Sequence, residues 1–190
     1  MASVLSTLRN DLTRKLILDA ALEALERSSV GELTVRGVAR RAKVSERTVF
    51  RYFPAREEFL DAVAEAVRAR FDLPPPPATL EELLAAPRAL YTRFDAVASL
   101  TQAALHSELF HRMRETQAKA RWLAVRKIVD DAAPDRPERE RRIAAANIRY
   151  YLAASTWHYY RFYFNFSLED TIACAEAAIR DALAALGRRL

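Results

Sequence analysis

TVRGVARRAKVSERTVFRYF, residues 34–53, is the stretch that decides the fold. Its pattern predicts two short helices with a tight turn at Lys43-Val44 between them. Thr34 and Ser45 stand where the two helices begin, and a hydroxyl there accepts a hydrogen bond from an unpaired backbone N–H of the first turn. Apolar residues recur at helical spacing and give each helix one inward face. The predicted inward residues are Val38, Ala39, Ala42, Val49 and Phe53.

The same stretch carries most of the net charge of the chain. From Thr34 to Arg56 there are seven basic residues and a single acid, Glu46, a net charge of +6 against +5 for the whole sequence. A basic helix-turn-helix on an otherwise near-neutral chain is typical of a protein that reads DNA. The alternative is a solvated helical hairpin, but the caps, the turn length and the charge together favour the DNA reader. The basic residues are Arg36, Arg40, Arg41, Lys43, Arg47, Arg51 and Arg56.

Residues 33–45 and 48–60 resemble the DNA-binding signature of the TetR family of bacterial transcriptional regulators. The resemblance ends at about residue 70, and beyond it the chain is similar to that family only in length and helical layout. Three positions depart from the family pattern. Lys43 stands where Gly is usual, which predicts a non-glycine residue at positive φ in the turn. Phe50 stands where many members have Tyr, and Arg56 stands where Lys is usual.

The composition predicts an all-α protein. The chain has 190 residues, 51% of them hydrophobic and only three of them glycine, and this length allows one or two domains with a sizeable core. The lone cysteine, Cys174, cannot form an internal disulfide, so a reducing compartment fits. The sequence has neither a signal-peptide pattern nor an apolar run of about 18 residues. We therefore expect a cytoplasmic protein that does not bind a membrane.

Helix-breaking residues divide the chain into a small head and a larger body. We expect a three-helix DNA-binding domain with a helix-turn-helix over residues 1–53. It begins with a loose arm and a first helix at about residues 11–27, and Gly31 is the expected breaker. A helical ligand-binding and dimerisation domain is expected over residues 54–190, and it starts with a connecting helix at about residues 55–72.

The body contains its own boundary signals. Four consecutive prolines, Pro74–Pro77, predict a stiff extended spacer. Thr79 then begins a capping box, and Pro87 predicts a break or kink in the helix that follows. Further along, the pattern predicts one very long helix over residues 138–164, and Ser167 caps the last helix.

The sequence contains no pattern of a catalytic or metal centre. Its histidines are His106, His111 and His158, and the first two diverge by roughly 140° around a helix. A helical two-histidine metal site needs a spacing of i, i+4. Gly-rich phosphate loops, nucleophile elbows and cysteine clusters are also missing from the sequence. We therefore expect no catalytic residue, no metal and no cofactor.

An aromatic cluster marks the body as the place for a ligand. Residues 150–166 hold nine of the eighteen Phe, Trp and Tyr residues, and most of these must serve core or subunit packing. One stripe of the expected long helix combines aromatic and polar side chains, as the walls of ligand pockets do. Such a pocket suits an apolar ligand with one or two polar groups and little charge. The expected ligand-binding residues are His106, Phe110, Trp122, Asn147, Tyr151 and His158.

Two groups of side chains are expected at the DNA. At the base edges, Glu46 can accept from cytosine and Arg47 can bind guanine. Phosphate contacts position the protein without reading the sequence, and we assign them to Arg36, Tyr52 and Arg56. The complete set of expected DNA-contacting residues is Arg36, Ser45, Glu46, Arg47, Thr48, Tyr52 and Arg56.

These patterns together predict a sequence-specific DNA-binding transcriptional regulator and not an enzyme. The family resemblance implies a homodimer on a palindromic double-stranded operator, and a repressor released by a small-molecule effector of unknown identity. Two alternatives stay open: a regulator with a filled core that responds to a protein partner, and a helical enzyme whose basic head is incidental. The resemblance and the apolar face of the last helix place the dimer interface at Ile172, Ala175, Ile179, Leu183 and Leu186.

Overall fold

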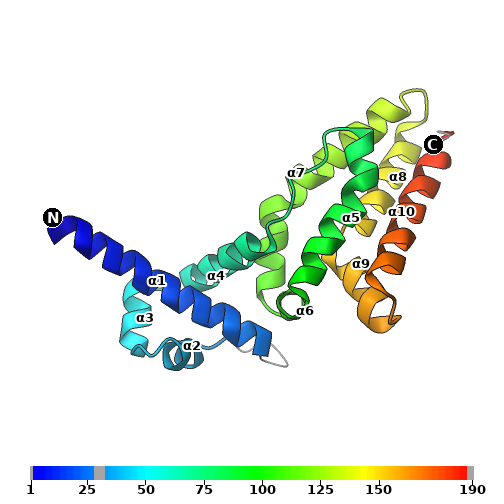
Figure 1. Cartoon of the computed structure of the whole chain (residues 1–190). Coiled ribbons are helices and arrows are strands. Elements are labelled where there is room, and N and C mark those ends of the chain that lie inside the picture. Colours follow the sequence, from blue (N-terminus) through cyan, green and yellow to red (C-terminus); the bar gives the residue numbers. More distant parts are fainter. Residues whose placement is uncertain (1, 28–32, 188–190) are drawn as a thin grey trace. The chain divides into compact units, whose positions relative to one another are not determined.

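The structure, a computed structural model, describes residues 2–27 and 33–187. Figure 1 shows that the elements in these ranges are helices joined by short connections, and no strand occurs among them. The predicted all-α class is therefore confirmed. Within the same ranges, none of the helices combines the length and the apolar character that a membrane crossing requires.

The chain divides into two compact units, which are described separately. Unit 1 contains the chain up to Arg70 together with Ser99–Met113. Unit 2 contains Phe71–Ala98 and the chain from Arg114 onward. The boundary that we expected after Phe53 thus lies inside unit 1. The covalent chain passes between the units at three places, and each of them lies inside a helix: α4, α6 and α7.

Unit 1 contains the helix-turn-helix and the supports around it. The second helix packs against the first and the third packs against the second, and the apolar side chains between them are buried, as predicted. The buried residues are Val38, Ala39, Ala42, Val49 and Phe53. The helices of this unit are α1 (Ala2–Arg27), α2 (Val35–Arg41), α3 (Glu46–Tyr52), nearly all of α4 (Arg56–Phe71), nearly all of α6 (Ala98–Leu105) and the start of α7 (Leu109–Ala132).

Hydroxyl caps begin both helices of the motif. Thr34 Oγ1 accepts from the Gly37 backbone N–H at 3.1 Å, and Ser45 Oγ accepts from the Thr48 N–H at 3.1 Å. Both predicted caps are therefore confirmed. A Cβ atom at Gly37 would lie 2.9 Å from the Thr34 hydroxyl oxygen, so a larger residue there would press on the cap.

The turn between α2 and α3 has the strained residue that the sequence predicts. Lys43 adopts φ 55°, which lies in the left-handed region that side chains other than glycine enter at a cost. The Val44 N–H donates to the Ala39 carbonyl at 3.0 Å and closes the turn. The chain therefore accepts backbone strain at this point to direct α3 away from α2.

The first helix differs from its prediction at its start. α1 begins at Ala2, so the loose arm that we expected before residue 11 is wrong. Ile17, Ala21 and Leu25 of this helix are buried, whereas Leu16 is exposed. The helix continues because its first turns contain neither Pro nor Gly. The breaker expected at Gly31 lies outside the described residues.

Unit 2 is built around its last helix. This helix packs on both α5 and α8, and its apolar face is buried in one continuous core with Leu83, Tyr91 and Trp157. Phe94 links that core to Phe71, with ring centroids 6.0 Å apart. The helices of unit 2 are α5 (Leu80–Ala96), most of α7, α8 (Glu138–Tyr151), α9 (Ala154–His158), the π-helix η1 (Tyr159–Tyr163) and α10 (Leu168–Ala184).

The very long helix expected over residues 138–164 is wrong, because α8, α9 and η1 occupy this range as separate elements. Assigning faces at a constant 100° per residue requires one uninterrupted helix, so the two predicted stripes do not exist as continuous surfaces. Of the aromatic residues in this region only Trp157 is fully buried. The exposed ones are Tyr150, Tyr159, Phe162, Tyr163, Phe164 and Phe166.

Side chains from two elements stabilise the break between α8 and α9. Ala153 leaves the helical region, with φ −97° and ψ 147°, so carbonyl groups at the end of α8 lose their helical partners. Thr156 Oγ1 donates to the Tyr150 carbonyl at 2.7 Å, and the Tyr91 hydroxyl donates to the Tyr151 carbonyl at 2.5 Å. Since Tyr91 belongs to α5, the break depends on tertiary packing.

Proline behaves differently at its two sites in unit 2. Pro87 lies inside α5, which continues from Leu80 to Ala96, so the break expected there is absent. The segment Pro74–Pro77 forms no helix, as predicted. We call this segment the proline strap. Thr79 caps α5 by accepting from the Glu82 N–H at 3.1 Å, and the Glu82 carboxylate in turn accepts from the Ala78 N–H at 2.7 Å.

The strain at Lys43 generates a stability prediction. Lys43→Gly should raise the free energy of unfolding by about 0.5–1 kcal/mol, because glycine adopts positive φ without a Cβ clash but costs more entropy on folding. Lys43→Ala is the matched control, since it removes the same charge and keeps the strain. Urea denaturation should rank glycine above both lysine and alanine. If the glycine variant is no more stable than the alanine variant, the backbone strain inferred at Lys43 is contradicted.

Candidate nucleic-acid interface and ligand cavity

The third helix presents polar side chains to solvent. Glu46 and Arg47 are exposed in its first turn, and Thr48 is half-buried. The Thr48 hydroxyl lies 2.9 Å from the Ser45 hydroxyl, so these two side chains form the cap and reinforce each other. Ser45 and Thr48 are thus occupied in the fold, whereas Glu46 and Arg47 project freely from it.

Most basic side chains around α3 have no acidic partner among the residues that the structure describes. In the part of the chain that the structure describes, Arg36, Arg40, Lys43 and Arg47 have no acid within ion-pair distance. Arg41 is different, because its guanidinium lies 3.7 Å from the Glu23 carboxylate of α1. Exposed cations without protein partners are the groups that exchange counterions for DNA phosphates.

The start of α1 adds residues that the sequence analysis missed. The Tyr52 hydroxyl donates to Asn10 Oδ1 at 3.1 Å, which attaches the first turns of α1 to the end of α3. Arg51 lies over the Tyr52 ring and Arg14 over the Phe53 ring. The contact joins segments about 40 residues apart in the sequence, so no local sequence signal places these residues beside α3. The hollow that they form is lined by Arg9, Asn10, Asp11, Arg14, Arg51 and Tyr52.

Ion pairs hold the start of α4 in unit 1. Arg56, an expected phosphate contact, pairs with Glu108. Arg112 of α7 pairs with Glu57 and, at 2.6 Å, with Asp61. Arg56 must therefore leave or share its carboxylate partner to reach a phosphate.

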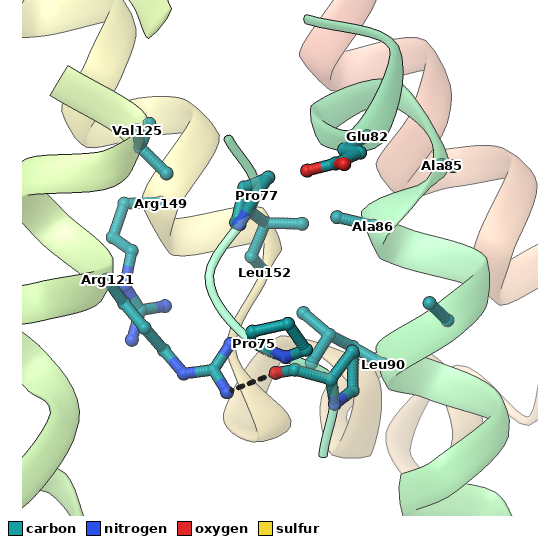
Figure 2. A pocket seen from close by; sticks show the side chains of 12 residues that line it. Pro75, Pro77, Glu82, Ala85, Ala86, Leu90, Arg121, Val125, Arg149 and Leu152 are labelled. Carbon is teal, nitrogen blue, oxygen red and sulfur yellow. Dashed lines mark hydrogen bonds between the residues drawn. The ribbon is translucent and has the colours of Figure 1, made fainter. Parts of the chain in front are cut away.

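Unit 2 contains a cavity of about 240 Å³ between the proline strap, α5, α7 and α8 (Figure 2). Figure 2 shows Arg121 and Arg149 on one side, Ala86 and Leu90 on the other, and Pro75 between them. Most of the remaining lining is apolar. The lining residues are Pro74, Pro75, Pro77, Glu82, Ala85, Ala86, Ala89, Leu90, Arg121, Val125, Arg149 and Leu152.

The two arginines at the cavity have different surroundings. Arg121 donates from Nη2 to the Pro74 carbonyl at 2.9 Å and from Nε to Gln117 Oε1 at 3.1 Å. Burial lowers the pKa of Arg121. Burial also lowers the pKa of Arg149, and the positive charges of Arg121 and Arg114 lower it further.

None of the six residues expected to bind a ligand lines this cavity. His106 is exposed and belongs to unit 1, which also contains Phe110. Asn147 is exposed on α8 and does not line this cavity. Trp122, Tyr151 and His158 are half-buried in unit 2. The error follows from the break after α8, which removes the stripe on which the assignment depended.

The residues expected at the dimer interface are interior residues of their own protomer. Ile172, Ala175, Ile179 and Leu183 are all 0% exposed, and Leu186 is nearly so. They pack within the core against α5 and α8. A partner cannot reach them, so this assignment is corrected: the face of α10 that remains available carries Ala173, Ala177, Arg180 and Ala184.

Comparison with known proteins agrees with the geometry of the head. Residues 17–63, which run from α1 into α4, match the family model described as bacterial regulatory proteins, tetR family. No curated protein matches the chain. The match contains the whole helix-turn-helix with its two caps and its unpaired cations. Residues 17–63 are therefore a DNA-binding domain of the tetR family of bacterial regulatory proteins, and the chain is a DNA-binding transcriptional regulator.

Proposed function

We propose that this regulator is a repressor that binds a palindromic operator as a homodimer and releases it when a small ligand occupies the cavity of unit 2. The observation that carries the proposal is that one chain combines a helix-turn-helix with unpaired cations and a separate unit with an apolar cavity. A repressor needs both, because DNA binding and ligand binding must be coupled through two states of the protein.

Exposure and pairing support separate roles for the DNA-facing residues. Glu46 and Arg47 project from the first turn of α3, where a recognition helix meets base edges in the major groove. Arg36 lies in the first turn of the preceding helix, α2. A basic residue at this position suits a phosphate contact. Arg47 therefore reads sequence, whereas Arg36 supplies affinity without reading sequence.

A second copy of the chain is proposed to cover the outward faces of α8 and α10. Ile143 and Tyr150 on α8 are 47% and 63% exposed, and Ala177 and Ala184 on α10 are also exposed. Small residues allow a partner helix to approach closely, and covering the larger apolar side chains removes their surface from water. Two-fold symmetry would present two heads to half-sites roughly 34–36 Å apart.

Chain continuity offers two routes by which a ligand can act on the head. The proline strap lines the cavity and follows α4 after Asp72 and Leu73. The helix α7 supplies Arg121 to the cavity and, earlier in the same helix, Arg112 to the ion pairs with Glu57 and Asp61 of α4. A ligand that displaces the strap or Arg121 therefore changes the constraints on α4, and it shifts DNA affinity by its differential affinity for the two states.

The division between base reading and phosphate contact is tested with two matched variants. Arg47→Ala should relax specificity at one base pair per half-site, at a cost of about 1–3 kcal/mol there. Arg36→Ala should weaken binding to all sequences alike and reduce the salt slope by about 1. Selection on a randomised operator library and binding titrations at several salt concentrations measure both effects. Uniform loss of affinity in both variants would refute the assigned roles.

The dimer surface is tested by placing charges on the outward faces. Ile143→Arg together with Ala177→Arg should give a folded monomer with weak operator binding, because two positive charges would then be buried between identical surfaces. Leu123→Arg is the control, since Leu123 is 54% exposed and lies on α7. Analytical ultracentrifugation at micromolar concentration decides the result. A wild-type protein that remains monomeric there would overturn the proposed dimer.

The coupling route is tested at the ion pairs of α4. Arg112→Gln should leave unchanged the binding of a ligand found by a thermal-shift screen. It should weaken the release of DNA by that ligand, because α7 then loses its ion pairs with Glu57 and Asp61. Arg68→Gln is the matched control, since Arg68 pairs with Glu65 inside α4 itself. Parallel ligand and operator titrations separate the two steps. Normal release by the Arg112 variant would exclude this route.

A further inference from the structure

We infer that the cavity of unit 2 binds a small carboxylic acid, with its carboxylate paired to Arg149 and its apolar body against the proline strap and α5. This inference rests on the proposed function, because it gives the chemical class of the proposed ligand. It also replaces the expectation from the sequence, which was an apolar ligand with one or two polar groups and little charge.

The walls of the cavity accept an apolar body of limited size. The strap contributes Pro74, Pro75 and Pro77, and the opposite side consists mainly of Ala85, Ala86, Ala89, Leu90 and Leu152. The cavity measures about 240 Å³, just below the roughly 300–1,000 Å³ of pockets for drug-sized ligands. A short aliphatic chain or a single aromatic ring with a short tail therefore fits better than a multi-ring compound.

The polar requirement of the cavity comes from Arg149. This side chain is partly buried, and within residues 2–27 and 33–187 no carboxylate lies within ion-pair distance of it. Arginine retains its charge even in such surroundings. Partial burial of a cation without a counter-charge costs free energy, because the charge loses part of its hydration. A ligand carboxylate would supply the missing charge through two parallel N–H···O bonds.

The neighbouring charged groups set the charge of the ligand. Arg121 donates hydrogen bonds to the Gln117 side chain and to the Pro74 carbonyl. It therefore holds the strap in place, and its charge adds to the positive potential in the cavity. Its charge and that of Arg114 depress the pKa of Arg149 beyond the effect of burial, and an anion would relieve this repulsion. Glu82 also lines the cavity, and its negative charge disfavours a ligand with several acidic groups.

Matched acids and amides test the inference on the full chain. Octanoate is compared with octanamide, and 3-phenylpropanoate with 3-phenylpropanamide, by isothermal titration calorimetry at pH 7. Each pair has nearly the same shape and differs in the charge of its head group. At least one acid should bind about tenfold more tightly than its amide, because charge-assisted bidentate hydrogen bonds are the stronger kind.

Variants locate the site of this preference. Arg149→Met keeps an unbranched side chain and removes the charge, and it should reduce the preference for the acid about tenfold or more. Arg142→Met is the matched control, since Arg142 lies on the same helix, is exposed and does not line the cavity. Circular dichroism checks that each variant folds. If Arg149→Met does not fold, the comparison of acid with amide on the wild-type protein decides.

Binding and DNA release are read separately, so that this inference and the proposed function fail in different ways. An acid that binds through Arg149 but leaves the operator occupied supports the inference and contradicts ligand-gated repression. A neutral compound that binds in the cavity and releases DNA while both acids fail would overturn the inference and support the proposed function. Equal binding of acid and amide, no binding of either acid at millimolar concentration, or an unchanged preference in Arg149→Met would likewise overturn it.

Discussion

The turn between α2 and α3 is the constraint on which the DNA-reading surface depends. Lys43 occupies the left-handed region, and the Ser45 hydroxyl begins α3 two residues later. Only this reversal lets α3 bury Val49 and Phe53 while Glu46 and Arg47 face outward. The backbone strain at Lys43 is offset by the packing that follows from it.

A second constraint is the interior position of α10. Because its apolar face fills the core of unit 2, this helix has only small and charged residues left for any outside contact. An amphipathic pattern shows that a helix buries one face but does not show whether its own chain or a partner covers that face. Ile179 and Leu183 illustrate the point, since both are 0% exposed in one protomer.

The role of a charged side chain in the cavity depends on what surrounds it. The chain has 30 lysines and arginines, and many of those that the structure describes are exposed or form an ion pair with an acid. Arg149 differs because it lines an enclosed space and, among the described residues, forms no ion pair, although Glu82 of α5 lines the same cavity. The strap follows α4 after Asp72 and Leu73, so one wall of the cavity is covalently close to the DNA-binding unit.

The sequence alone determined the head, its caps and its charge, because these follow from local rules: a hydroxyl at Thr34 or Ser45 reaches an N–H three residues away. It also determined the all-α class. The tertiary structure decided where helices in the body break and which faces are covered. The end of α8 is stabilised by Tyr91, 60 residues away from the carbonyl it binds. The cavity likewise combines Pro74, Arg121 and Arg149 from distant segments. No local sequence pattern predicts that such distant residues lie close together.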